Sequence, residues 1–195
     1  MNFLAHLALS VPEDEHRLGA IMGDFMAGVE LATLPKDVQA GIYHHRQIDA
    51  FTDSHGEVLR LRQLFSSSRR RFAGIILDVT FDHFLVRHWD RYHSEDLREF
   101  VAACHAALGR GTAWMPPRMR WVVDHMISQQ WLIGYGDLPY VGRALDGLAS
   151  RLSGSHGFHG AIGEVEANYA ELEKGFLMFY PQLQQAWGQS HDMTS

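Results

Sequence analysis

The chain of 195 residues is 46% hydrophobic and 21% charged, which is typical of a single globular domain with a sizeable core. Its formal net charge of −6 argues against a general nucleic-acid-binding protein, which usually carries a basic surface. Cys104 is the only cysteine and no apolar run approaches the roughly 18 residues of a membrane span, so we expect a cytoplasmic protein without disulfides or a membrane anchor.

Helical periodicity dominates the sequence, and no alternating strand pattern is present, so we predict an all-α fold. In chain order, helices are predicted over residues 2–9, 13–28, 35–53, 57–65, 69–92, 94–108, 116–133, 137–152 and 161–179. We expect residues 1–187 to form one single-domain helical bundle and residues 188–195 to be a frayed tail.

Two titratable residues of the first two predicted helices have apolar neighbours. His6 lies in an apolar opening segment, where a histidine more often bonds to the backbone than to a metal. Asp24 is the only charged residue between positions 19 and 29. Because burial of an unpaired carboxylate is costly, Asp24 needs a cation, a hydrogen-bond cluster or a metal. An N-cap or an arginine partner is the alternative for this acid.

The predicted helix over residues 35–53 carries histidine, arginine and acids at helical spacing. His45 and Asp49 stand four residues apart, and Asp53 repeats the interval, so the three project from one face. Neutral imidazole and carboxylate together suit manganese, iron or zinc. Arg46 lies close enough to reach these acids or a phosphate oxyanion. The alternative is a surface lattice of opposite charges.

A second pair of acids lies in the most apolar predicted helix. Asp78 and Asp82 stand four residues apart on a stripe that Ile75 and Leu85 continue. Two like charges held together repel unless a proton or a cation lies between them, and a divalent metal uses oxygen ligands of this kind. The alternative is a pair of acids bonded to arginines at a helix crossing. Together with the earlier residues, the pair predicts a metal site in a helical bundle core.

Short motifs occur in a fixed order along nearly the whole chain. They are Asn2-Phe3-Leu4-Ala5-His6-Leu7, Met22-Gly23-Asp24-Phe25, His45-Arg46, Ile48-Asp49, Thr52-Asp53, Asp78-Val79, Asp82-His83-Phe84-Leu85, Gln130-Trp131-Leu132 and Phe179-Tyr180-Pro181. In this order they resemble the acyl carrier protein phosphodiesterase family. The resemblance implies hydrolysis of holo-acyl carrier protein to the apo form and 4′-phosphopantetheine, with Mn²⁺ as the metal, or Mg²⁺ or Fe²⁺ in its place.

The resemblance also implies a fold related to the helical HD-domain phosphohydrolases. The chain departs from that pattern because it has no His-Asp doublet, and Asp82-His83 is the reverse order. Taken with the spacing of the residues, the family resemblance makes His83 a candidate general acid and Arg46 a candidate phosphate-binding residue. The predicted metal ligands are His6, Asp24, Asp78 and Asp82, with His45 and Asp49 as further ligands or supporting residues.

Arginines concentrate beside the predicted site, and we predict that they bind the acidic carrier protein. This arginine ridge consists of Arg60, Arg62, Arg69, Arg70 and Arg71. An ordinary solvated loop is the alternative. Two further functions remain open, namely an HD-like phosphohydrolase acting on a small nucleotide and a non-catalytic helical binding protein. The oligomeric state is not predicted.

Overall fold

The computed structural model describes residues 1–151 and 158–187, and every regular element in this part of the chain is helical, as predicted. The α-helices are α1 (Phe3–Leu9), α2 (Asp14–Met22), α3 (Lys36–Ser54), α4 (Gly56–Arg62), α5 (Ala73–Arg87), α6 (Trp89–Tyr92), α7 (Leu97–Arg110), α8 (Pro117–Ser128), α9 (Trp131–Gly134), α10 (Leu138–Ala149), α11 (Ile162–Ala167) and α12 (Tyr169–Trp187). Short 3₁₀ helices are η1 (Gly23–Phe25), η2 (Leu31–Thr33), η3 (Arg70–Phe72) and η4 (Thr112–Trp114).

The domain prediction for residues 1–187 stays a prediction, and the predicted tail at 188–195 lies outside the described residues. Among the helices of the described part, none is both long and apolar enough to cross a membrane.

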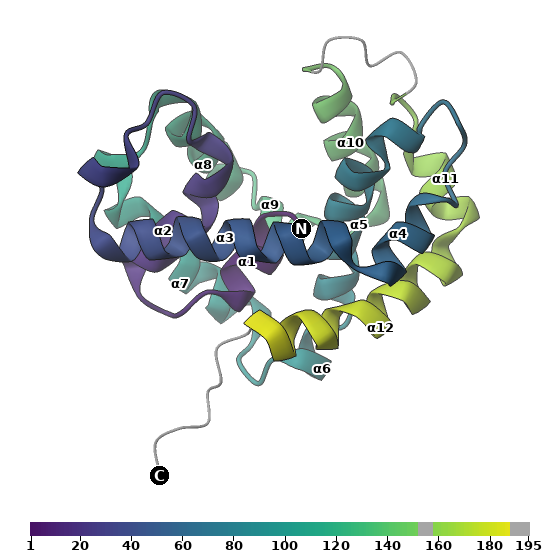
Figure 1. Ribbon diagram of the computed structural model, residues 1–195, viewed down its shortest axis with the longest axis horizontal. Helices are drawn as coiled ribbons and strands as arrows, with labels where there is room; N and C mark the ends of the chain where they lie inside the picture. Colours follow the sequence, from purple (N-terminus) through teal and green to yellow (C-terminus); the bar gives the residue numbers. More distant parts are fainter. Residues whose placement is uncertain (152–157, 188–195) are drawn as a thin grey trace.

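Helix α3 runs across the molecule and packs closely against α2, while α12 crosses beneath it (Figure 1). Glycines allow the close approach of α2 and α3. A Cβ at Gly41 would lie 2.2 Å from the carbonyl oxygen of His16, and one at Gly19 would lie 2.2 Å from that of Val38. The two backbones therefore touch, which brings the second half of α3 beside the end of α2.

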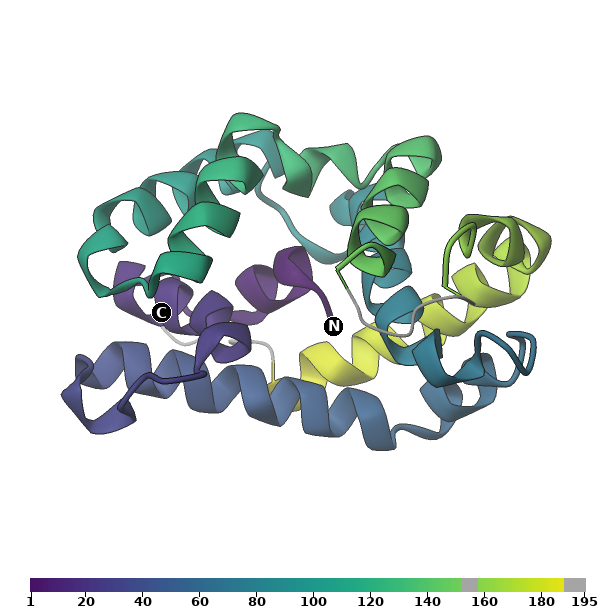
Figure 2. The same ribbon diagram turned by 90° about the horizontal axis from the view of Figure 1, so that it is seen from above.

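The short helix α1 lies inside the molecule, between α3 and the helices on the opposite side (Figure 2). Its side chains Leu4, Ala5, His6, Leu7 and Leu9 are buried. The first backbone amides of a helix have no partner within the helix and must bond elsewhere when they are buried. In α1, Asp82 of α5 takes this role, so α1 is fixed to the centre of the fold.

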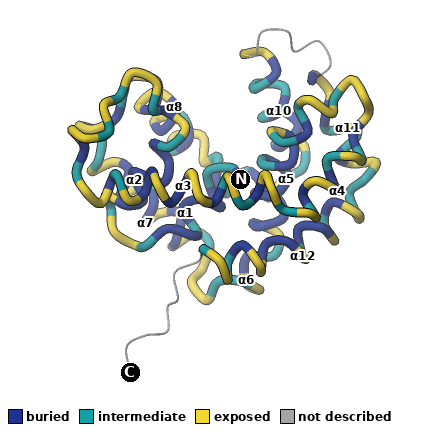
Figure 3. The backbone as a smooth tube through the Cα atoms, viewed as in Figure 1, coloured by how far each residue is buried: buried dark blue, intermediate teal, exposed yellow. Residues whose placement is uncertain are grey.

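Several predicted helices end earlier than their apolar pattern does. The one predicted over 13–28 ends at Met22, and η1 and a largely exposed segment follow (Figure 3). The one predicted over 69–92 is divided into η3, α5 and α6, with a break at His88.

Two later helices also differ from their predictions. The helix predicted over 116–133 is interrupted at Gln130, whose φ of 53° is left-handed and ends the helical hydrogen bonding. The helix predicted over 161–179 breaks at Asn168, and its second part, α12, continues through Pro181 to Trp187.

Candidate metal centre

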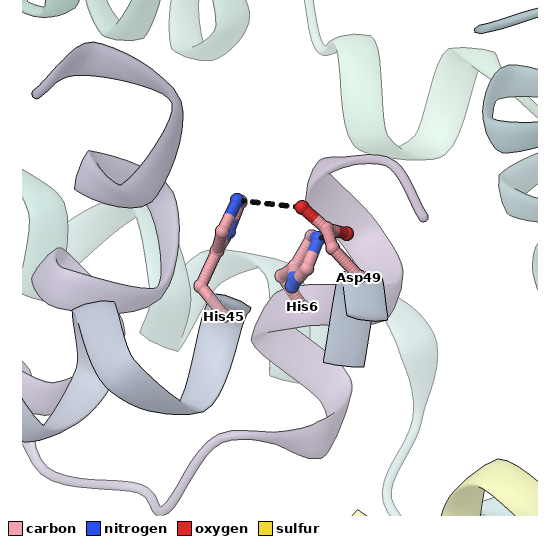
Figure 4. A group of neighbouring side chains, drawn as sticks. All are labelled: His6, His45 and Asp49. Atoms are coloured by element: carbon pink, nitrogen blue, oxygen red, sulfur yellow. Dashed lines mark ion pairs between the residues drawn. The ribbon is translucent and has the colours of Figure 1, made fainter. Parts of the chain in front are cut away.

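Two histidines and an aspartate from α1 and α3 meet at the centre of the fold (Figure 4). The Asp49 carboxylate lies between both imidazoles, with Oδ1 3.1 Å from His6 Nε2 and Oδ2 3.1 Å from His45 Nε2. Both histidines are buried, whereas the Asp49 side chain is 39% exposed. The predicted alignment of His45 and Asp49 is therefore present, and His6 joins them from a distant part of the sequence.

The ring of His45 is held in one orientation by its surroundings. Its Nδ1 donates a hydrogen bond to the carbonyl oxygen of Ala20 at 2.7 Å, which turns Nε2 toward the acids. Its edge lies against Gly23, where a Cβ would be 2.3 Å from the ring, so only glycine fits. The His6 and His45 rings stack with centroids 3.9 Å apart. The result is a pair of imidazoles that share the Asp49 carboxylate.

The two histidines differ in protonation because their neighbours differ. Burial lowers the pKa of His6 to about 4, so this ring is neutral near pH 7. Burial also acts against a charge on His45, but its hydrogen bonds with Asp24 and Asp49 outweigh it and raise the pKa to about 9. Burial works against ionisation of Asp49 too, yet the hydrogen bonds from His45 and His6 hold its pKa well below the usual range. The centre thus favours a cation beside an ionised Asp49.

Two further predicted acids lie beside this centre. Asp24 Oδ1 is 3.4 Å from His45 Nε2, and the Asp24 side chain is 49% exposed. Asp78 Oδ1 lies 2.9 Å from the amino group of Met1, which is itself 3.3 Å from Asp49 Oδ1. Although burial acts against its charge, these acids raise the pKa of the amino group to about 10. The space between Asp49 and Asp78 therefore already accommodates a cation.

Asp82 is not part of the group of His6, His45 and Asp49, and it binds backbone amides of α1. Its Oδ2 accepts from the amide of Leu4 at 2.8 Å, and its Oδ1 accepts from that of Ala5 at 3.1 Å. Burial raises the pKa of Asp82 to about 7, against the effect of these two bonds. Both oxygens thus bind the start of α1, the helix that contains His6.

The two predicted catalytic residues lie outside the group around Asp49. Arg46 is exposed on α3 and is not among the residues that line the adjoining cavity. His83 is buried, where its Nδ1 donates to the carbonyl oxygen of Tyr135 at 2.7 Å and its Nε2 bonds the Tyr169 hydroxyl at 2.9 Å. Both ring nitrogens of His83 are therefore already bonded within the fold.

Three members of the predicted arginine ridge are paired inside the protein. Arg60 binds Glu57, Arg62 binds Asp53, and Arg69 binds Glu164. Arg70 and Arg71 are exposed, with Arg70 donating to a backbone carbonyl and Arg71 over the ring of Phe72. The ridge thus presents less free positive charge than its sequence indicates.

A cavity of about 590 Å³ adjoins the centre, and Asp24, Asp49 and Asp78 belong to its lining. Aromatic side chains form much of its wall, including Phe25, Trp131 and Tyr140. Its volume is in the range that holds a small organic ligand.

The cavity lining also includes three arginines that the sequence analysis did not single out, namely Arg118, Arg143 and Arg151. Each looks like an ordinary exposed arginine, two of them on amphipathic helices and Arg151 just after one. Only the folding of α8 and α10 toward the centre distinguishes them from other surface arginines.

The donor set fits a divalent transition metal. One nitrogen of each histidine and one Asp49 oxygen lie within 4.8 Å of one another. The His45 ring has the second hydrogen bond that commonly orients metal-binding histidines, through Ala20. Mixed nitrogen and oxygen donors of this kind suit manganese, iron or zinc. Asp24 lies 3.4 Å from His45 Nε2, and Asp78 is linked to Asp49 through the amino group of Met1, whereas each Asp82 oxygen accepts a hydrogen bond from α1.

Comparison with known proteins gives a match over almost the whole chain. Residues 1–183 match the family model described as acyl carrier protein phosphodiesterase. A protein of that name from Escherichia coli O157:H7 (strain EC4115 / EHEC) is 38% identical over 184 residues, which cover 94% of this chain and 95% of the relative. Its namesake from Serratia proteamaculans (strain 568) is 37% identical over 186 residues, covering 95% and 96%. No solved structure matches the chain.

Proposed function

The chain belongs to the acyl carrier protein phosphodiesterase family, and on that premise we propose that it hydrolyses holo-acyl carrier protein. Water adds to the phosphorus of the phosphodiester, and the bond to the serine oxygen of the carrier breaks. The products are 4′-phosphopantetheine and the apo carrier, whose serine oxygen leaves with a proton. The observation that carries the proposal is the His6, His45 and Asp49 group beside an aromatic-lined cavity, in a chain of this family.

We propose that these three residues hold a divalent cation, with Asp24 and Asp78 as the nearest further oxygen donors. Mn²⁺ is our first choice, and Mg²⁺ or Fe²⁺ are compatible with an oxygen-rich set. When bound, such a cation lowers the pKa of a water and withdraws charge from a phosphoryl oxygen. The geometry supports this assignment, because the Asp49 carboxylate lies between the Nε2 atoms of both histidines and is ionised near neutral pH.

The remaining residues position these groups and shape the site. The carbonyl of Ala20 and the bare backbone of Gly23 hold the His45 ring, and Asp82 holds α1 and therefore His6. The aromatic wall of the cavity can pack against the apolar parts of the pantetheine arm and exclude water from the phosphodiester. Groups that are held in position in this way lower the activation barrier of the hydrolysis.

We assign His83 a supporting role rather than proton transfer, because its ring nitrogens are bonded to Tyr135 and Tyr169. A role for Arg46 in phosphate binding stays a prediction, and it would require the exposed side chain to reach over the centre. A relation to HD-domain phosphohydrolases and a cytoplasmic location also stay predictions.

The test uses the full-length protein with holo-acyl carrier protein and Mn²⁺, Mg²⁺ or Fe²⁺, and follows the mass of the carrier. We expect loss of the phosphopantetheine group with Mn²⁺, and no loss after chelation of the metal. His45→Ala should reduce the rate at least about 100-fold, since it removes a metal-binding imidazole and disorders Asp49. His159→Ala, an exposed histidine outside the cavity lining, is the control. An intact holo carrier with every metal would contradict the proposal, and turnover of a small nucleotide instead would favour the alternative.

A further inference from the structure

The arginines of the cavity lining occupy a different position from the predicted arginine ridge. Arg118 lies on α8, Arg143 lies on α10, and Arg151 lies two residues beyond the end of α10. Figure 1 shows α8 and α10 on two sides of the amino terminus, which is part of the cavity lining. The acids of the lining come from η1, α3 and α5. One cavity therefore joins a group of acids to a group of arginines.

These arginines rest on aromatic rings rather than on acids. The Arg118 guanidinium is 5.9 Å from the centre of the Phe25 ring, and that of Arg151 is 5.2 Å from the centre of the Trp121 ring. Within residues 1–151 and 158–187, neither forms an ion pair. Arg143 lies over Tyr140 and only reaches Asp137 at 4.0 Å. Their positive charge is thus largely available to a partner, unlike that of the paired ridge arginines.

Trp121 adds exposed aromatic surface at the same place. Its side chain is 47% exposed on α8, one helical turn from Arg118. A tryptophan exposed to this extent and flanked by arginines has the composition of protein-interface hot spots. Arg118, Trp121, Arg143 and Arg151 form what we call the α8–α10 patch.

We propose that the α8–α10 patch docks an acidic face of the carrier protein and guides its anionic phosphodiester into the cavity. The inference rests on the proposed function. Its physical basis is charge: Asp24, Asp49 and Asp78 repel an anionic group, and the chain as a whole carries −6. Arginines at the same cavity offset that repulsion, and they attract a negatively charged partner that comes within about one Debye length. The patch, and not the arginine ridge, then determines binding of the carrier.

Single exposed charges contribute little, so the test removes three together. The variant is Arg118→Ala/Arg143→Ala/Arg151→Ala. The matched control is Arg87→Ala/Arg91→Ala/Arg98→Ala, which removes three exposed arginines outside the cavity lining. Holo-acyl carrier protein turnover is measured with Mn²⁺ over a series of NaCl concentrations. Circular dichroism and Mn²⁺ affinity confirm that each variant is folded and loaded, and Arg118→Gln/Arg151→Gln replaces the triple variant if it does not fold.

We expect the patch variant to raise KM about tenfold or more, to keep kcat within about twofold, and to lose most of the salt dependence of kcat/KM. Trp121→Ala should raise KM without changing the salt dependence, because it removes only apolar contact. The control variant should behave as the wild type.

Other outcomes test the docking surface and the proposed function separately. Wild-type turnover with an unchanged KM in the patch variant would overturn the docking surface and leave the proposed function intact. A larger increase in KM for Arg70→Ala/Arg71→Ala than for the patch variant would overturn the docking surface in favour of the arginine ridge. If an oligonucleotide inhibits turnover at least as strongly as apo carrier does, the patch is a nucleic-acid-binding surface instead. A wild type that is inactive on the carrier with every metal would overturn the proposed function and the docking surface together.

Discussion

His45 depends on residues that carry no chemistry of their own. The carbonyl of Ala20 fixes which nitrogen faces Asp49, and Gly23 leaves the space in which the ring lies. Its pKa of about 9 arises from Asp24 and Asp49, so a cation that binds Nε2 must displace a proton. The properties of this histidine are thus set by two elements, the end of α2 and the second half of α3.

Asp82 provides the clearest test at the scale of one residue, because it separates support of α1 from metal binding. Asp82→Ala removes both acceptors of the Leu4 and Ala5 amides in a buried place, and we expect a loss of about 3 kcal/mol in the free energy of unfolding. Asp82→Asn keeps one acceptor and should lose only about 1 kcal/mol. Urea unfolding of the metal-free protein measures both values.

Mn²⁺ affinity provides the control for Asp82. If Asp82 supports α1, folded Asp82→Asn should bind Mn²⁺ within about threefold of the wild type, since both Asp82 oxygens accept hydrogen bonds from the amides of α1. A normally stable Asp82→Asn that no longer binds the metal would instead make Asp82 a ligand, as the sequence pattern had predicted.

At the scale of elements, the position of the centre depends on the contact of α2 with α3. Gly41→Ala would place a methyl group 2.2 Å from the carbonyl oxygen of His16, so the helices would have to separate. We expect a loss of at least about 2 kcal/mol in the free energy of unfolding and weaker Mn²⁺ binding, because His45 moves with α3.

Gly109→Ala is the matched control for Gly41→Ala, since it lies in α7 with no heavy atom near the added methyl group. It should leave stability unchanged or raise it by up to about 1 kcal/mol, through the higher helix propensity of alanine. Equal losses in the two variants would show that helix packing at Gly41 is not tight.

Apolar periodicity predicted which segments are helical but not where they stop. No proline or glycine stands at His88, Gln130 or Asn168, so the sequence contains no signal for a helix end at these positions. Conversely, Pro181 lies inside α12, although proline usually ends a helix. Contacts between distant segments decide these positions. A pattern within one helix contains no information on them.

The same limit applies to the site. Spacing on one helix predicted that His45 and Asp49 align, and they do. Spacing also paired Asp82 with Asp78, although the structure turns Asp82 toward α1. That His6 joins Asp49 depends on where α1 lies, and here the motif resemblance supplied what periodicity could not. Arg118, Arg143 and Arg151 had no such support, because an exposed arginine on a helix is ordinary until its neighbours in space are known.

At the scale of the whole molecule, the fold brings residues of α1, η1, α3 and α5 together around one cavity, and residues of α8 and α10 complete its lining. In the proposed function, a cation binds at the part of the cavity that Asp24, Asp49 and Asp78 line, and the arginines favour an anion at another part. A phosphodiester on an acidic protein needs both. Under the proposed function, this division accounts for the action of a chain with net charge −6 on an anionic substrate.

We propose that His6, His45 and Asp49 hold the catalytic metal. Isothermal titration of the metal-free protein with Mn²⁺ tests it most directly, with the wild type, His6→Ala, His45→Ala and the control His159→Ala compared at one pH. We predict a site in the wild type and the control that His6→Ala and His45→Ala each weaken at least about 10-fold, while circular dichroism shows unchanged helix content. Folded His6→Ala and His45→Ala proteins that bind Mn²⁺ as the wild type does would contradict the claim.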